Sequence, residues 1–379
     1  MAVASFAMLP VVSFADVSPA RTPDVALLGE LVGVRSFSRD IGAVNRAERL
    51  VKGWLEARGI TCVVETMPDG HEIVYASTKP GKMQDVILAT HLDTVPADDA
   101  MYPMRRDGDR VFGRGVYDCK GNVLACLHAL VALKDNASVG CIFGADEEVG
   151  GVTTRWMVER GYRPRRIALV IDGGWKSVVY AQKGLTYYTV TARGKGGHSA
   201  FPWESDDNAT RLLLAYARLR TAWDAAHPVT DDKWCDLLTL TQVKADGGAL
   251  NRIPDEASLV VNLRSTALDS ADRTERFIRE TTGLDVVRGE DSKPCQSDPD
   301  DPRVQLLRKC LQARFPGADI PLKRTMGATD ARCFYDCGVP AVLTGIEGGG
   351  EHGPDEWASV SSIGEAAALL VDFARTLGR

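Results

Sequence analysis

Residues 85–91, Asp-Val-Ile-Leu-Ala-Thr-His (DVILATH), decide the fold of this 379-residue chain. Such a continuous apolar run is typical of a strand that is buried on both faces of a parallel sheet. SVGCIFGA at 138–145 and IALVID at 167–172 have the same character. Between the three runs, an amphipathic helix is predicted at 121–135 and a second helix at 152–161. Strands that alternate with helices predict an α/β fold, a mostly parallel sheet flanked by helices.

The segments on either side of this core predict a second, inserted domain. A helix from Ile41 to Gly59 and two strands, at 61–66 and 72–78, precede the core. After Gly184 the order changes to a strand at 185–194, a helix at 207–226 with an Asp-rich cap, strands at 234–245 and 257–265, a helix at 267–283 and a strand at 284–290. This βαββαβ order predicts a two-layer unit with its own antiparallel sheet.

A polar linker at 291–302 separates this unit from a helix at 304–315 and a strand at 339–345, which resume the first pattern. The sequence therefore predicts a catalytic domain in two parts, residues 1–183 and 292–379, and an inserted lid domain, residues 184–291.

Composition narrows the class of protein. A net charge of −6 argues against a nucleic-acid partner, which would need a basic face. The nine scattered cysteines favour reduced thiols over a disulfide framework. Residues 1–20 are apolar like the core of a signal peptide but lack preceding basic residues, so a cytoplasmic protein is favoured and export is the alternative. No other segment approaches the ~20 apolar residues of a membrane span.

Polar side chains follow each of the three buried strands. His91 and Asp93 follow the first, Glu147 and Glu148 the second, and Asp172 the third. Because ligands bind outside the carboxyl ends of strands in open α/β sheets, we expect these side chains at one edge. His91 and Asp93 are two residues apart, so the carboxylate can accept the ring N–H and orient the histidine. Adjacent glutamates on an extended backbone would point to opposite sides and divide their roles.

Asp118, just ahead of the helix at 121–135, and His352, in a glycine-rich loop, extend this group. A lone histidine or acid is more often satisfied by local hydrogen bonds or caps a helix. We give that interpretation to three other histidines, His71, His128 and His227. It is less convincing for the whole set of strand-end and loop residues.

Charge favours two cations at this edge. Asp118, Glu148 and Asp172 would bring three negative charges to one pocket, which is strongly repulsive without metal. Two divalent ions and a bridging hydroxide would bring the cluster close to neutral. Nitrogen and oxygen ligands fit Zn²⁺, two per chain, and do not exclude Co²⁺ or Mn²⁺.

The chain resembles the metallopeptidase and amidohydrolase family that includes acetylornithine deacetylase, succinyl-diaminopimelate desuccinylase, aminoacylase and glutamate carboxypeptidase. The matching segments are THLDTVP (90–96), GRGVYDCKG (113–121), DEEVGG (146–151), VIDGG (170–174), GKGGHSAFP (194–202), NRIPDEASLVVNLR (251–264), GATDAR (327–332) and EHGPDEW (351–357). Their combination and order are specific, and they cover the chain from about Ile41 to its end. The inserted unit likewise resembles this family's dimerisation domain, which implies a homodimer formed through the lid.

The resemblance implies a role for each matching residue. His91 and Asp172 would hold one metal, Glu148 and His352 the other, and Asp118 would bridge both. Three residues would act in catalysis: Glu147 as general base, Asp93 as the partner of His91, and His198 as the lid residue that stabilises the oxyanion, across a dimer interface in one variant of this hypothesis. Four residues would bind substrate: Asn251, Arg264 as the carboxylate clamp, Gly327 and Thr329. Cys119 departs from the methionine of many relatives and is interpreted as a packing variation.

These features predict a hydrolase that cleaves an amide bond next to a free carboxylate with a two-metal-activated water. The expected substrate is a small molecule or short peptide, with an N-acyl amino acid deacylase as the first hypothesis. A dipeptidase or carboxypeptidase of the same family is the alternative, because it would share all these residues. A non-catalytic binding protein on this fold is a more distant alternative. It should have lost a ligand or the base, yet every expected position is filled.

Overall fold

The chain forms two compact units in the computed structural model, which describes residues 22–379. Unit 1 contains the described residues up to Ala181, together with Gln296–Arg324 and Thr329–Arg379. Unit 2 contains Gln182–Cys295 and Thr325–Ala328. The main boundaries fall within a few residues of those expected from the sequence. The sequence did not predict that the short segment Thr325–Ala328 belongs to unit 2. The Lys183 N–H donates to the Thr325 carbonyl in this segment (3.3 Å). Residues 1–20, which have the apolar character of a signal-peptide core, lie outside the described residues.

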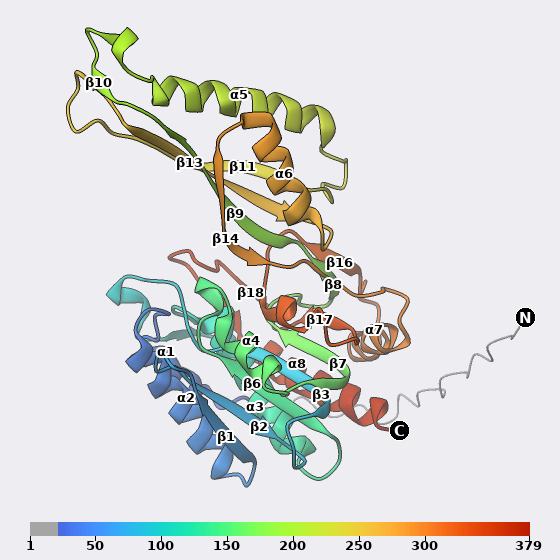
Figure 1. Ribbon diagram of the computed structural model, residues 1–379. Helices are drawn as coiled ribbons and strands as arrows, with labels where there is room; N and C mark the ends of the chain where they lie inside the picture. Colours follow the sequence, from blue (N-terminus) through green and yellow to red (C-terminus); the bar gives the residue numbers. More distant parts are fainter. Residues whose placement is uncertain (1–21) are drawn as a thin grey trace, which may run out of the picture. The chain divides into compact units, whose positions relative to one another are not determined.

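A nine-stranded sheet, in the order β1-β2-β6-β3-β7-β17-β8-β15 with β16 beside β8, organises unit 1. Its strands are β1 (Thr61–Thr66), β2 (Glu72–Ser77), β3 (Gln84–His91), β6 (Val139–Gly144), β7 (Pro164–Ile171), β8 (Val178–Gln182), β15 (Cys295–Gln296), β16 (Leu322–Thr325) and β17 (Ala341–Thr344). The central strands β6, β3, β7 and β17 are parallel, whereas β1, β2 and β8 run antiparallel to neighbours. The predicted α/β fold with a mostly parallel sheet is confirmed (Figure 1).

The described residues of unit 1 form six α-helices: α1 (Val25–Gly33), α2 (Ile41–Glu56), α3 (Gly121–Leu133), α4 (Val152–Glu159), α7 (Pro302–Arg314) and α8 (Val360–Leu377). The sequence did not predict α1 or α8. The prediction of an amphipathic α3 was wrong, because this helix packs against both the sheet and α8 and is buried over most of its surface. Among the described residues, only the window Val116–Leu133 has the length and hydropathy of a membrane span, and 78% of it is buried inside the protein.

Short elements complete unit 1. A small antiparallel sheet joins β4 (Arg105–Asp107), β5 (Arg110–Phe112), β18 (Gly348–Gly349) and β19 (Trp357–Ser359) in the order β18-β19-β5-β4. Pairing of β19 with β5 brings the loop between β18 and β19 next to the loop that follows β5. Both loops carry residues of the candidate site.

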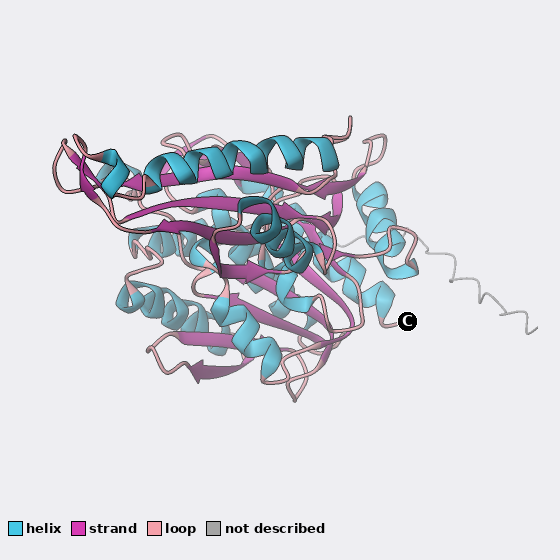
Figure 2. Cartoon of the chain, turned by 45° about the horizontal axis from the view of Figure 1, so that its top comes forward, coloured by secondary structure: helices cyan, strands magenta, loops and turns pink. Residues whose placement is uncertain are grey.

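Unit 2 has the predicted βαββαβ order: β9 (Gly184–Arg193), α5 (Asn208–Ala226), β11 (Leu237–Ala245), β13 (Glu256–Ser265), α6 (Ser270–Thr282) and β14 (Asp285–Ser292). The antiparallel sheet has the order β11-β13-β9-β14, and α5 and α6 contact each other and cover one face of it (Figure 2). Asp207 caps α5 by accepting from the Thr210 N–H (3.1 Å), as the Asp-rich start predicted. A two-residue ladder of β10 (Gly197–His198) and β12 (Arg252–Ile253) extends beyond one end of this sheet.

Candidate active site

The last residue of β3, His91, lies at the carboxyl edge of the sheet with its ring buried. Its Nε2 atom is 3.0 Å from Asp118 Oδ1. Its Nδ1 atom is 3.1 Å from the Asp93 carbonyl oxygen and 3.2 Å from Asp93 Oδ1. The predicted contact between His91 and Asp93 is therefore present. If Nδ1 donates its proton to Asp93, Nε2 on the Asp118 side is left to bind a metal, and such a carboxylate or carbonyl partner is common for metal-binding histidines.

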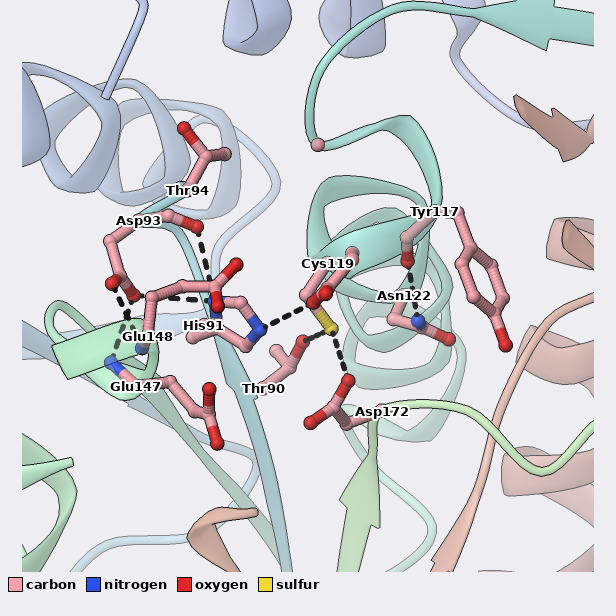
Figure 3. A network of polar contacts seen from close by, with 12 residues as sticks. Thr90, His91, Asp93, Thr94, Tyr117, Cys119, Asn122, Glu147, Glu148 and Asp172 are labelled. Carbon is pink, nitrogen blue, oxygen red and sulfur yellow. Dashed lines mark hydrogen bonds and ion pairs between the residues drawn. The ribbon is translucent and has the colours of Figure 1, made fainter. Parts of the chain in front are cut away.

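Asp93 also holds the turn that carries the two glutamates. Its carboxylate accepts from the N–H groups of Glu147 (3.0 Å) and Glu148 (3.3 Å), and from the Ser38 hydroxyl (2.7 Å). The prediction of an extended backbone here was wrong, because Glu147–Val149 form a helical turn. Both N–H groups consequently face the Asp93 carboxylate, and the two side chains leave the turn in different directions (Figure 3).

Asp118 lies between two histidines from distant parts of the chain. Its Oδ1 atom is 3.0 Å from His91 Nε2, and its Oδ2 atom is 3.3 Å from His352 Nε2. His352 Nε2 is also 2.9 Å from Glu148 Oε2. The peptide bond between Asp118 and Cys119 is cis. The contacts form one chain, His91–Asp118–His352–Glu148, in which Asp118 is the shared member.

Asp172 completes the group at the end of β7. The candidate ligand atoms form two clusters, each within 4.8 Å: His91, Asp118, Cys119 and Asp172 in one, and Asp118, Glu148 and His352 in the other. Asp118 belongs to both clusters. The structure thus brings together all five residues for which we predict a metal-binding role. The two clusters contain the two predicted ligand sets, and the first also contains Cys119, which was not predicted as a ligand.

Cys119 is fully buried and already engaged in hydrogen bonds. Its thiol donates to the Ile171 carbonyl (3.2 Å), lies 3.1 Å from the Thr90 hydroxyl and lies 3.7 Å from Asp172 Oδ1 (Figure 3). Burial raises the pKa of the Cys119 thiol to about 12, which disfavours the thiolate. A protonated, enclosed thiol is consistent with the packing interpretation.

The electrostatics of the site fit divalent cations. Burial raises the pKa of Glu148 to about 7 and that of Asp172 to about 6, and the Asp118 charge adds to both effects. Burial also opposes ionisation of Asp118, but hydrogen bonds from His352 and His91 hold its pKa below the ordinary value. Glu148 Oε1 is buried and has no hydrogen-bond partner among the described residues. Cations would stabilise these ionised carboxylates, and the nitrogen and oxygen donors suit Zn²⁺, Co²⁺ or Mn²⁺.

Glu147 stands apart from both clusters of candidate ligand atoms. Burial raises its pKa well above the ordinary value for a glutamate, and the nearby Asp172 charge acts in the same direction. A carboxyl group with a raised pKa is suited to moving protons between a water molecule and a leaving group.

The remaining predicted site residues are divided between the units. His198 and Asn251 are exposed in unit 2 and adjacent, since His198 pairs with Arg252 and the Ser199 N–H donates to the Asn251 carbonyl (2.9 Å). Arg264 is half-buried near the other end of β13. The loop 327–332 is shared: Gly327 belongs to unit 2, and Thr329 belongs to unit 1, where its hydroxyl accepts from the Ala331 N–H (3.3 Å). The functions of these residues stay predictions.

The three histidines that received a structural interpretation lie outside both clusters. His71 Nδ1 is 2.9 Å from Asp69 Oδ2, His128 Nε2 accepts from the Asp24 N–H (3.1 Å), and the His227 ring stacks on Trp223. Each therefore has a local partner.

Two clusters of carboxylate and histidine side chains at the carboxyl edge of an α/β sheet are typical of metal-dependent hydrolases. Residues 87–376 match the model of peptidase family M20/M25/M40, and the chain belongs to this family. The protein is thus a hydrolase of the M20 peptidase family.

Curated relatives of the chain include two kinds of enzyme. A succinyl-diaminopimelate desuccinylase of Granulibacter bethesdensis is 27% identical over 376 residues, which cover 86% of this chain and 92% of the relative. A probable carboxypeptidase of Aspergillus niger is 26% identical over 294 residues, 70% of each chain.

Solved structures share the fold at lower identity. A tripeptidase from Staphylococcus aureus has a TM-score of 0.77 at 15% identity and covers 95% of this chain and 100% of its own. A dinuclear metal-binding peptidase of the M20 family from Bacillus subtilis has a TM-score of 0.66 at 14% identity, with 94% and 99% coverage.

Proposed function

We propose that the protein hydrolyses an amide bond next to a free carboxylate and that its substrates are N-acyl amino acids. The observation that carries this proposal is Asp118, which is shared by two clusters of candidate metal ligands beside the buried Glu147. His91 and Asp172 would hold one zinc ion, Glu148 and His352 the second, and Asp118 both. The Bacillus subtilis neighbour, described as dinuclear, supports two ions.

The residues of the chain divide the work of this reaction. The bound ions would polarise the scissile carbonyl and acidify the attacking water. Glu147 takes a proton from that water and passes it to the leaving nitrogen, which its raised pKa favours. The His198 ring donates a hydrogen bond to the developing oxyanion. Arg264 binds the substrate carboxylate with its planar guanidinium, helped by Asn251, Gly327 and Thr329.

Hydrolysis of N-acyl amino acids and the alternative, hydrolysis of short peptides, differ in the group on the carbonyl side of the bond that is cleaved. The desuccinylase of Granulibacter bethesdensis, which matches over 92% of its length, favours N-acyl amino acids. The probable carboxypeptidase and the tripeptidase favour the alternative, cleavage of short peptides. Both versions need the same ligands and the same base.

A substrate panel after metal removal tests the proposal. The purified protein should lose hydrolysis of N-acyl amino acids on chelation and regain it when Zn²⁺, Co²⁺ or Mn²⁺ is added back, because the ions provide several kcal/mol of charge stabilisation in the transition state. N-acetyl and N-succinyl amino acids, dipeptides and the same compounds with an amidated carboxylate are compared by amine release. Equal rates on amidated substrates would contradict the carboxylate clamp, and hydrolysis of dipeptides alone would favour the alternative.

We also propose that the protein is a homodimer formed through unit 2. His198 and Asn251 lie beyond the Glu256 end of β13, whereas Arg264 is eight residues further along that strand, roughly 25 Å away at about 3.3 Å per residue. One bound substrate of small size cannot reach both ends. A second copy that supplies His198 would solve this problem. The edge strand β11 and the exposed Leu213, Leu214 and Val243 are available for that contact.

Mixing two inactive variants tests the dimer and the origin of His198. In an equimolar mixture of His198→Ala and Glu147→Ala proteins, each heterodimer would contain one site with both side chains intact. Random pairing should restore about a quarter of wild-type activity. The control is each variant mixed with itself after the same unfolding and refolding or subunit exchange. Sedimentation that shows a monomer, or a mixture no more active than its components, would contradict the proposal.

We propose the cytoplasm as the site of action. All nine cysteines are free thiols, which suits a reducing compartment. Fractionation of the producing cells would test this location. Recovery of the protein outside the cytoplasmic fraction would favour the alternative, export.

A further inference from the structure

One buried carboxylate, Glu356, joins the two loops that present Asp118 and His352. Its Oε1 atom accepts from the N–H groups of Tyr117 and Asp118, both at 3.0 Å. Its Oε2 atom accepts from the Gly115 N–H (2.9 Å) and from Arg114 Nη1 (2.7 Å). Four donors from the segment 114–118 therefore converge on a side chain that lies four residues after His352.

Arg114 also connects the two loops, through two hydrogen bonds of its guanidinium. Its Nη2 atom donates to the Gly353 carbonyl (3.0 Å), next to His352, while Nη1 holds Glu356. The side chain of Arg114 is 3% exposed and that of Glu356 is 0% exposed. Hydrogen bonds between buried ionised partners are short, strong and directional, so this pair sets the spacing of the two loops.

The His352 loop needs such an external support because its backbone is unusual. His352 itself has φ +61°, and Gly350 has φ +73° with so little room that an added Cβ would lie 2.8 Å from the Asp355 carbonyl oxygen. The His352 side chain is 55% exposed. Packing around the ring therefore contributes little to its position. The side-chain contacts of Glu356 and Arg114 tie its loop to the Asp118 loop, in addition to the backbone hydrogen bond from the Gly113 N–H to the Glu356 carbonyl (3.2 Å).

We propose that Glu356 is a positioning residue for metal binding, because it fixes the backbone of Asp118 and the loop of His352 in one arrangement. This inference rests on the proposed function in so far as Asp118 and His352 bind ions. Partners of metal ligands commonly change metal affinity by about 10–100-fold when they are removed.

Glu356→Gln is the test, and Asp355→Asn is the matched control. The first variant keeps the shape but replaces one acceptor oxygen by an amide and removes the charge opposite Arg114. The control removes one charge from the adjacent exposed side chain. Metal-free proteins are titrated with Zn²⁺ by calorimetry, well below their melting temperatures. We expect at least one ion to bind about 10–100-fold more weakly to Glu356→Gln, and two ions to bind to Asp355→Asn as to the wild type.

A role of Glu356 in stability alone would give a different result for Glu356→Gln. It would lower the melting temperature of the metal-free protein and leave the affinity for Zn²⁺ unchanged. If Glu356→Gln does not fold, Arg114→Lys replaces it, since lysine keeps the charge but cannot contact Glu356 and Gly353 at once. Two ions bound with wild-type affinity by a folded variant would overturn the inference alone. A wild-type protein that binds no ion would overturn it together with the proposed function, whereas failure of the substrate panel alone would leave it standing.

Discussion

Replacement of Glu147 by Gln is expected to lower kcat by about 10²–10⁴-fold, the range for loss of a general acid–base group. That corresponds to roughly 3–5 kcal/mol of transition-state stabilisation. Glutamine fills the same space but cannot accept a proton from the attacking water or return one to the leaving nitrogen. Glu147 lies outside both ligand clusters, so the metal content should not change. Turnover of an N-acyl amino acid and elemental analysis of the same sample measure the two quantities.

The control for this change is Glu159→Gln, which removes an exposed carboxylate at the end of α4 and should leave kcat and metal content unaltered. A Glu147→Gln protein with nearly wild-type kcat would show that another group moves the proton. A large loss of metal would show instead that Glu147 is a ligand, in which case the division of roles between Glu147 and Glu148 would be wrong.

The sequence predicted the core of the fold because buried strands leave a clear signal. Apolar runs such as 85–91 and 167–172 are long enough to be recognised, and the rule that ligands bind at the carboxyl ends of strands then places His91 and Asp172 at one edge. The same reasoning groups Glu148 with them. Asp118 and His352 extended the group by their positions ahead of a helix and in a glycine-rich loop. Their assignment to particular ions came only from the family resemblance, since loop residues have no periodicity of their own.

What could not be predicted was how side chains hold the backbone around these residues. The contacts of Asp93 with two backbone N–H groups, and of Glu356 with three, depend on the loop path, which no spacing in the sequence specifies. The helical turn at Glu147–Val149 was missed for the same reason. The amphipathic reading of α3 failed because a helix between a sheet and another helix is buried on most sides, and this depends on α8, which the sequence did not predict.

Asp118→Asn should have a larger effect than any change confined to one cluster, because Asp118 is the member that both clusters share. Asparagine keeps one neutral oxygen but loses the negative charge between His91 and His352. We expect metal content to fall for both ions, and hydrolysis to fall roughly 10³-fold or more, since the ions supply several kcal/mol of charge stabilisation and each 1.36 kcal/mol is a factor of ten.

Comparison with Asp172→Asn turns this prediction into a test of the shared position. Asp172 belongs only to the cluster of His91, so its loss should weaken one ion and spare the one at Glu148 and His352. Asp98→Asn, at an exposed position without a side-chain cap contact, is the control that should keep both ions. Calorimetric titration of the three metal-free variants separates the cases. If Asp118→Asn and Asp172→Asn lose the same single ion, Asp118 does not bridge, because a bridging carboxylate cannot be removed without affecting both sides.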